Sequence, residues 1–104
     1  MTEKARWKDW AERLRQEMMG SRTPNVTKSV VAIAAETDTT KGEATLQSER
    51  FWRACQAGKS PNDFLTTAGF EIDFEADDRR VEEVTFKLNG TWSRILQGVI
   101  DRES

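Results

Sequence analysis

Apolar residues recur at helical spacing near the N-terminus of the chain. They form one stripe, with Lys and Arg mostly outside it: Trp7, Trp10, Ala11, Leu14 and Met18. This spacing predicts an amphipathic helix within residues 1–20, with Thr2 as its N-cap and Gly20 at its end. The segment GSRTPN, residues 20–25, is then a turn or short linker.

Helical spacing returns in the second half of the chain. One apolar face consists of Ala44, Ser48, Phe51, Trp52 and Cys55. It predicts a helix over about 43–57, ended by Gly58. The segment SPND at 60–63 begins a short helix that Gly69 ends. A last stripe predicts a C-terminal helix, capped by Thr91 after the turn at Asn89 and Gly90: Trp92, Ile95, Leu96, Val99 and Ile100.

The segment 26–37 is ambiguous. Val30, Ile33 and Ala34 have helical spacing, and Thr27 is a candidate cap. The run VVAI within the segment also suits a short buried strand, and spacing alone does not decide between the two. The alanines favour a helix. Residues 38–43, DTTKGE, are expected to form a loop.

Between residues 70 and 88 the apolar residues alternate with polar ones, as in a half-buried strand. Two alternating runs flank the polar segment ADDRR, which predicts an antiparallel hairpin. The expected register places Phe74 opposite Val84, so that the outer face pairs Glu71 with Lys87, Asp73 with Thr85 and Glu75 with Glu83.

Val81 breaks this alternation, which indicates a bulge near Glu82 or a later start of the second strand. In a rival interpretation Asp78 caps a helix that carries Val81, Val84 and Leu88. The β-branched and aromatic residues favour the strand.

These elements predict an α+β fold. Residues 1–104 form a single small domain, in which the hairpin at about 70–88 packs against three or four helices. A lone hairpin is not stable in water, so helices must cover one of its faces.

Composition excludes several kinds of site. The chain has one cysteine and no histidine, so it lacks an intramolecular disulfide, a cysteine-rich zinc site and the usual base at neutral pH. No apolar run is long enough to cross a membrane. A reducing compartment, and hence a cytoplasmic location, is the expected setting. No metal and no cofactor is expected.

Charge is distributed unevenly along the chain. Residues 61–104 carry ten acidic and five basic side chains, and residues 70–83 alone hold seven carboxylates. Successive outward residues on a strand lie ~6.5–7 Å apart, too far for one strand to grip a small ion. The candidate partner-binding carboxylates are therefore expected to meet another protein with a basic surface: Glu71, Asp73, Glu75 and Glu83.

Trp7 and Trp10 are the second candidate for partner binding. Tryptophan is enriched where proteins bind one another, and two such residues on one helix could anchor a partner or a second copy of the chain. The alternative is that both rings cover the domain's own sheet.

The expected function is a non-catalytic protein-binding module: an adaptor, an inhibitor or a small regulatory subunit. Homo-oligomerisation is compatible with it. The alternative is a nucleic-acid-binding regulator that uses basic positions of the first helix: Lys4, Arg6, Lys8, Arg13 and Arg15. A third class, an enzyme that uses a metal with Asp73, Glu75 or Glu83, is less compatible with the strand spacing. Cys55 has no histidine to activate it and is expected to be a buried structural thiol.

Overall fold

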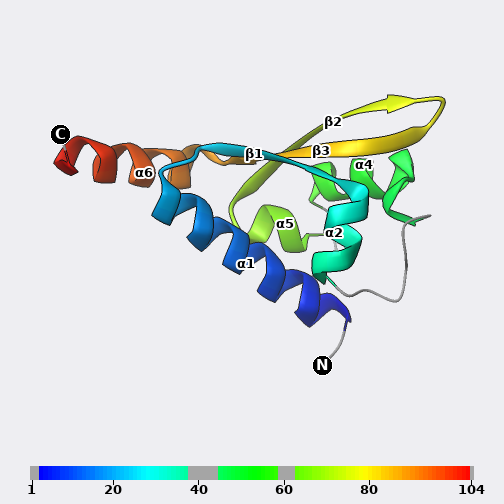
Figure 1. Ribbon diagram of the computed structural model, residues 1–104, viewed down its shortest axis with the longest axis horizontal. Helices are drawn as coiled ribbons and strands as arrows, with labels where there is room; N and C mark the ends of the chain where they lie inside the picture. The colour runs from blue at the N-terminus through cyan, green and yellow to red at the C-terminus, as the bar shows by residue number, and fades with distance from the viewer. Residues whose placement is uncertain (1–2, 38–44, 59–62, 104) are drawn as a thin grey trace.

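The computed structural model describes residues 3–37, 45–58 and 63–103 (Figure 1). The helices and strands, in chain order, are α1 (Glu3–Ser21), β1 (Asn25–Ser29), α2 (Val30–Thr37), α4 (Glu49–Ala57), α5 (Phe64–Thr67), β2 (Phe70–Asp77), β3 (Arg80–Leu88) and α6 (Gly90–Glu103). The three strands form one antiparallel sheet in the order β1-β3-β2, so the predicted α+β class is confirmed.

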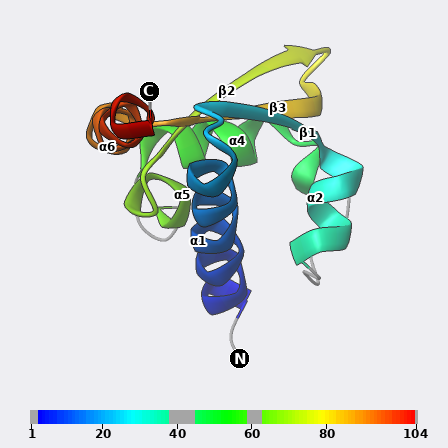
Figure 2. The same cartoon turned by 60° about the vertical axis from the view of Figure 1, so that its left-hand side comes forward.

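In the described part of the chain, the helices that cover the sheet lie on one of its faces. In Figure 1 the sheet forms the upper layer, with α1, α2, α4 and α5 below it, and α6 continues past its end. Figure 2 shows the same arrangement from a second direction, with the upper face of the sheet bare. None of the helices in the described ranges has the length and apolar character needed to span a bilayer. We call the bare side the outer face of the sheet.

The predicted hairpin register is confirmed from Phe70 to Phe74. Phe74 lies opposite Val84, and the outer face pairs Glu71 with Lys87 and Asp73 with Thr85. The register shifts between Phe74 and Ala76, because Ala76 lies opposite Val81. One residue of β2 therefore faces two residues of β3, which is the bulge predicted near Glu82. The rival interpretation, in which Asp78 caps a helix, is wrong, because residues 80–88 form β3.

The segment 26–37 is divided between a strand and a helix. Its first residues pair with β3, Val26 opposite Phe86, and extend the predicted hairpin to three strands. The Leu88 amide also donates to the Pro24 carbonyl, at 3.0 Å. The helix begins only at Val30, where the Ser29 hydroxyl accepts a hydrogen bond from the Ala32 amide. The preference for helix was wrong before Val30, because pairing with β3 overrides local propensity.

The helix expected over 43–57 is interrupted: Thr45 and Leu46 are helical, the chain leaves the helix at residues 47–48, and α4 begins at Glu49. Ser48 has an extended backbone and forms an isolated bridge with Arg80, and the Val81 amide donates to the Gln47 carbonyl at 2.8 Å. Hydrogen bonds to the hairpin thus interrupt the predicted helix at residues 47–48. Gly58 ends α4 in the left-handed conformation, as predicted. Residues 43 and 44, the expected loop at 38–43 and the expected helix start at 60–62 lie outside the described residues.

Aromatic rings fill the space between α1 and the sheet. Trp7 lies against Phe64 with ring centroids 5.1 Å apart, and Trp10 meets Phe86 edge-on at 5.4 Å. The buried Trp52 indole donates to the Leu46 carbonyl at 2.6 Å. Aromatic pairs stabilise by about 0.5–1.5 kcal/mol beyond the burial of their area, so this cluster is a large part of the core. Cys55 is buried beside it, as expected.

The junction of α5, β2 and α6 requires a glycine at position 69. Gly69 has a φ of +102°, and a Cβ there would lie 2.2 Å from Cδ1 of Trp92. The Asn89 amide donates to the Gly69 carbonyl at 2.8 Å. Arg15 stacks over Trp92, 4.1 Å from its ring centroid, and donates to the Ala68 carbonyl. This junction fixes the start of α6.

A hydrogen-bonded ion pair holds the other end of α6. The Arg22 guanidinium donates to the Glu103 carboxylate and also to the Met19 carbonyl at the end of α1. The hydrogen bond from Arg22 lowers the pKa of Glu103 below its ordinary value. The helix is thus tied to the turn between α1 and β1.

Gly69→Ala should lower the free energy of unfolding by about 3 kcal/mol or more, because the new methyl group displaces Trp92 and the backbone strain remains. Chemical denaturation measures the change. Gly20→Ala is the matched control, since nothing lies within 4 Å of its Cβ position. That variant should be neutral or stabilised by up to about 1 kcal/mol. Equal effects of the two substitutions would contradict the packing at Gly69.

Arg79→Gly should stabilise the protein. The hairpin turn has positive φ at both central residues, +50° at Asp78 and +64° at Arg79, a conformation that glycine adopts without strain. We expect a gain of about 0.5–1 kcal/mol in the free energy of unfolding, after the larger backbone entropy of glycine is subtracted. Arg80→Gly, one residue on and inside β3, should destabilise instead. A loss of stability in Arg79→Gly would show that residue 79 does not have a positive φ in the turn.

Candidate functional site

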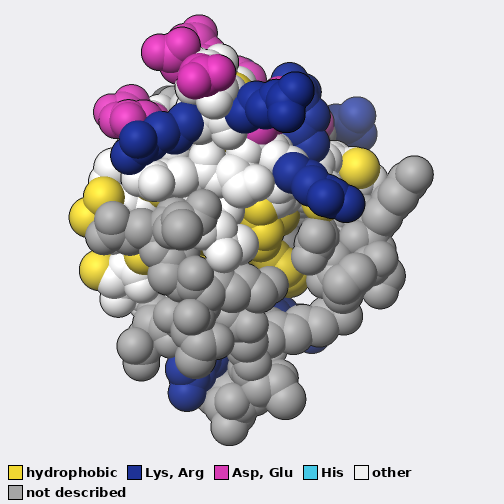
Figure 3. All heavy atoms as spheres, turned by 90° about the vertical axis from the view of Figure 1, so that its right-hand side faces the viewer, with side chains coloured by type: hydrophobic (Ala, Val, Ile, Leu, Met, Phe, Trp, Pro, Cys, Tyr) yellow, Lys and Arg dark blue, Asp and Glu magenta, His cyan; other side chains and the backbone are white. Residues whose placement is uncertain are grey.

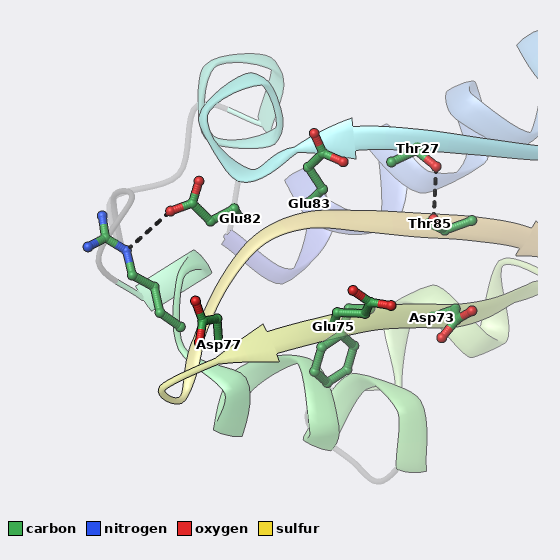
Figure 4. Close-up of a pocket in the computed structure, with 9 residues that line it drawn as sticks. Thr27, Asp73, Glu75, Asp77, Glu82, Glu83 and Thr85 are labelled. Carbon is green, nitrogen blue, oxygen red and sulfur yellow. Dashed lines mark hydrogen bonds and ion pairs between the residues drawn. The ribbon is translucent and has the colours of Figure 1, made fainter.

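The outer face of the sheet contains the candidate functional site, a shallow hollow of about 500 Å³. Its walls come from all three strands, and Figure 4 shows their side chains. The lining residues are Thr27, Asp73, Phe74, Glu75, Asp77, Arg80, Glu82, Glu83 and Thr85. Five carboxylates against one guanidinium give the hollow an excess of four negative charges. We call this surface the acidic face.

The bulge concentrates carboxylates at one point of the acidic face. Because Phe74 pairs with Val84 and Ala76 with Val81, Glu75 of β2 faces both Glu82 and Glu83 of β3. Figure 4 shows Glu75 and Glu83 on neighbouring strands, while Glu82 is linked to an arginine. That arginine is Arg80, whose Nε lies 3.7 Å from the carboxylate. In a regular hairpin, by contrast, only Glu83 would face Glu75.

Few of these charges are neutralised within the molecule. Lys87 lies 3.3 Å from the Asp73 carboxylate, in an exposed pair. The hydroxyls of Thr27 and Thr85 form a hydrogen bond of 2.8 Å across β1 and β3. Within the described ranges, no ion pair or hydrogen bond reaches the carboxylates of Glu75, Asp77 or Glu83. The acidic face therefore attracts a cationic group from outside.

The structure brings together the four carboxylates that the sequence predicted as partner-binding. Asp73, Glu75 and Glu83 line the hollow, and Glu71 lies on the same face further along β2. Asp77 and Glu82 also line it and were not predicted. The bulge near Glu82 was the signal that could have added Glu82 to the site. Among the described residues no group of three or more Asp, Glu or Cys side chains is arranged to hold a metal ion.

Trp7 and Trp10 lie elsewhere. The structure places both in the protein's own core, with 1% and 5% of their surfaces exposed, as the alternative interpretation expected. The T-shaped contact between the two rings has a centroid distance of 5.7 Å. A partner could reach them only by opening the core between α1 and the sheet. They therefore form no part of the surface that this fold presents.

Of the five basic positions proposed for nucleic acid, at least three are engaged within the molecule, Arg6 among them. Arg13 forms an ion pair with Asp9 at 2.9 Å, and Arg15 binds the junction beside Trp92. Lys8 is exposed and Arg6 is partly buried, while the Lys4 side chain lies outside the described part of the chain. The structure therefore does not gather the five residues into one free basic surface.

The edge strand β1 carries an inward-facing ion pair that the sequence did not predict. Lys28 pairs with Val84 on the helix-covered side and lies 3.0 Å from the Glu36 carboxylate of α2. The Trp10 indole donates to the same carboxylate at 3.4 Å. An inward-facing charge on an edge strand discourages further strands from pairing with it. The Lys28 charge thus makes β1 a poor edge for a partner strand to pair with.

Trp7→Ala should lower the free energy of unfolding by about 3–5 kcal/mol, because it leaves a large cavity between α1 and the sheet. Lys8→Ala, at an exposed position beside it, should change stability by less than about 0.5 kcal/mol. Thermal and chemical denaturation of the two variants make the comparison. Unchanged stability in Trp7→Ala would mean that the ring does not belong to the core.

Comparisons with protein-family models, with curated proteins and with solved structures give no match for this chain. No relative therefore assigns it a function. The shape and charge of the acidic face are what bear on that question.

Proposed function

We propose that this chain is a non-catalytic protein-binding module whose acidic face contacts a partner with a basic surface. One observation carries the proposal: the sheet face without helices is hollowed and holds carboxylates that have no cation within the described structure. An adaptor, an inhibitor and a small regulatory subunit all fit this role.

The grouping of like charges supports binding over simple solvation. Like charges placed opposite one another on a sheet are destabilising, and Glu75 faces two other carboxylates. Lys or Arg groups of a partner would relieve this repulsion. The same field would speed encounter with a basic partner, and its effect would weaken as salt screens it.

The chemistry of the acidic face supports a non-catalytic role. The acidic face offers carboxylates and the hydroxyls of Thr27 and Thr85. The chain has no histidine, and its one cysteine is buried. A nucleic acid would be repelled by the excess of four negative charges, so this face does not favour the alternative function. A second copy of the acidic face would be repelled in the same way, so the partner presents a different surface.

A charge-neutralised variant tests the proposal. The variant Asp73→Asn/Glu75→Gln/Glu83→Gln removes three charges from the acidic face without changing side-chain size. We expect the full chain to capture a specific protein from a nuclease-treated extract of its source. The purified partner should bind the variant at least about tenfold more weakly, since several charge-assisted contacts are lost.

The control is Glu12→Gln/Glu17→Gln/Asp101→Asn, which removes the same charge from α1 and α6. It should bind like the unmodified protein, and raised salt should weaken both. The proposal is contradicted by equal binding of the two triple variants, by no partner, or by a partner whose recovery nuclease abolishes.

A further inference from the structure

A second hollow, of about 350 Å³, lies between the start of α4 and the hairpin turn. It is lined by Ser48, Glu49, Arg50, Arg53 and Arg79. Figure 3 views the end of the molecule that carries this turn and shows Lys and Arg side chains gathered over its upper part, next to Asp and Glu. We call this hollow the arginine hollow. Its residues come from two segments far apart in the sequence.

Backbone hydrogen bonds fix these two segments against each other. The Glu49 amide donates to the Arg79 carbonyl at 3.2 Å, and Ser48 forms its bridge with Arg80. The fold therefore places the three arginines around one space.

Positive side chains outnumber negative ones in the arginine hollow. Both Nε and one terminal nitrogen of Arg53 lie 3.0 Å from the same Glu49 oxygen. In the part of the chain that the structure describes, no ion pair or hydrogen bond involves the guanidinium of Arg50 or Arg79. Three positive charges against one negative leave an excess of two. Like charges held together favour the binding of an anion.

Arg79 occupies a position at which glycine would be less strained. Its φ of +64° is in the left-handed region, where a side chain costs free energy. Residues held in such conformations cluster at sites of function. The side chain at this position lines the hollow, which gives a physical reason for an arginine there.

We propose that the arginine hollow binds a phosphate monoester group. Such a group carries about −1.5 to −2 charge at pH 7, which matches the excess of two positive charges. The planar guanidinium donates two parallel hydrogen bonds to phosphate oxygens. Arg50 and Arg79 make these contacts, and the Ser48 hydroxyl, which forms no capping hydrogen bond to α4, is available to donate a further one. This site is independent of the acidic face.

Inorganic phosphate is the first probe, added to the full-length protein at pH 7.5 while amide and arginine Nε signals are followed by NMR. Sodium chloride at equal ionic strength is the reference. Phosphate should shift the signals of residues 48–50 and 79 with saturation, and chloride should not. Equal shifts with both salts, or no saturation, would overturn the proposal.

Four variants assign the binding to the hollow. Arg50→Gln and Arg79→Gly should each weaken phosphate binding by about tenfold, the effect of losing a charge-assisted hydrogen bond. Arg94→Gln, which removes the same charge from α6, should bind within about twofold of the unmodified protein, since salt screens a distant charge. Glu49→Gln should bind several times more tightly, because it frees Arg53. Arg79→Gly is expected to be more stable, so its loss of binding would not reflect unfolding. Unchanged binding in Arg50→Gln and Arg79→Gly would overturn the proposal.

The charge of the ligand gives a further test. Phosphate binding should weaken as the pH falls below about 6, because phosphate then loses its second charge, whereas sulfate binding should persist. A phosphoserine peptide and adenosine monophosphate distinguish the two sources of the group. Tighter binding of the peptide would indicate a phosphorylated protein, and tighter binding of the nucleotide would indicate a small metabolite. Pronounced weakening of sulfate binding over the same pH range would contradict a site made of arginines.

Discussion

Strand β3 is the element on which the rest of the structure depends, because it is hydrogen-bonded on both sides. It pairs with β1 on one side and β2 on the other, and its first residues also meet the segment before α4. Phe86 projects from it into the aromatic cluster, where it contacts Trp10 and Trp52. Hydrogen bonds to both neighbouring strands stabilise β3 and fix the register of all three strands.

The two charged surfaces follow from the placement of β3. Its bulge sets Glu82 and Glu83 against Glu75 on the outer face. Its first residue bridges to Ser48, which brings α4 under the hairpin turn and forms the arginine hollow. The hairpin thus carries an acidic surface on one side of its tip and a basic one beside it. A protein with both can bind two kinds of charged group, and the net charge of −2 conceals this division.

The sequence predicted the hairpin and its acidic face well, because alternation determines which side chains share a face of a strand. It missed β1, since NVTKS is short and mostly polar and becomes a strand only by pairing with β3. It also predicted one unbroken helix over 43–57, whereas the backbone at residues 47–49 bonds to the hairpin and separates the helical residues 45–46 from α4.

The candidate sites also depend on contacts between distant segments, which the sequence pattern did not show. Spacing along α1 indicated an apolar stripe but could not show that the domain's own core would bury Trp7 and Trp10. The arginine hollow joins residues 48–53 with residue 79, and no local pattern relates them. Glu82 joined the acidic face through the bulge, for which Val81 was the signal, and Asp77 continues the alternation of Glu71, Asp73 and Glu75.

Native-state hydrogen exchange of the β3 amides tests the central place of this strand most directly. The bond from Leu88 to Pro24 indicates that the alternate amides of Val84 and Phe86 point toward β1, and those of Thr85 and Lys87 toward β2. We expect all four to exchange slowly, through unfolding of the whole domain. Fast exchange at Val84 and Phe86, with protection kept at Thr85 and Lys87, would show that β1 is not paired. That result would contradict the sheet on which both charged surfaces rest.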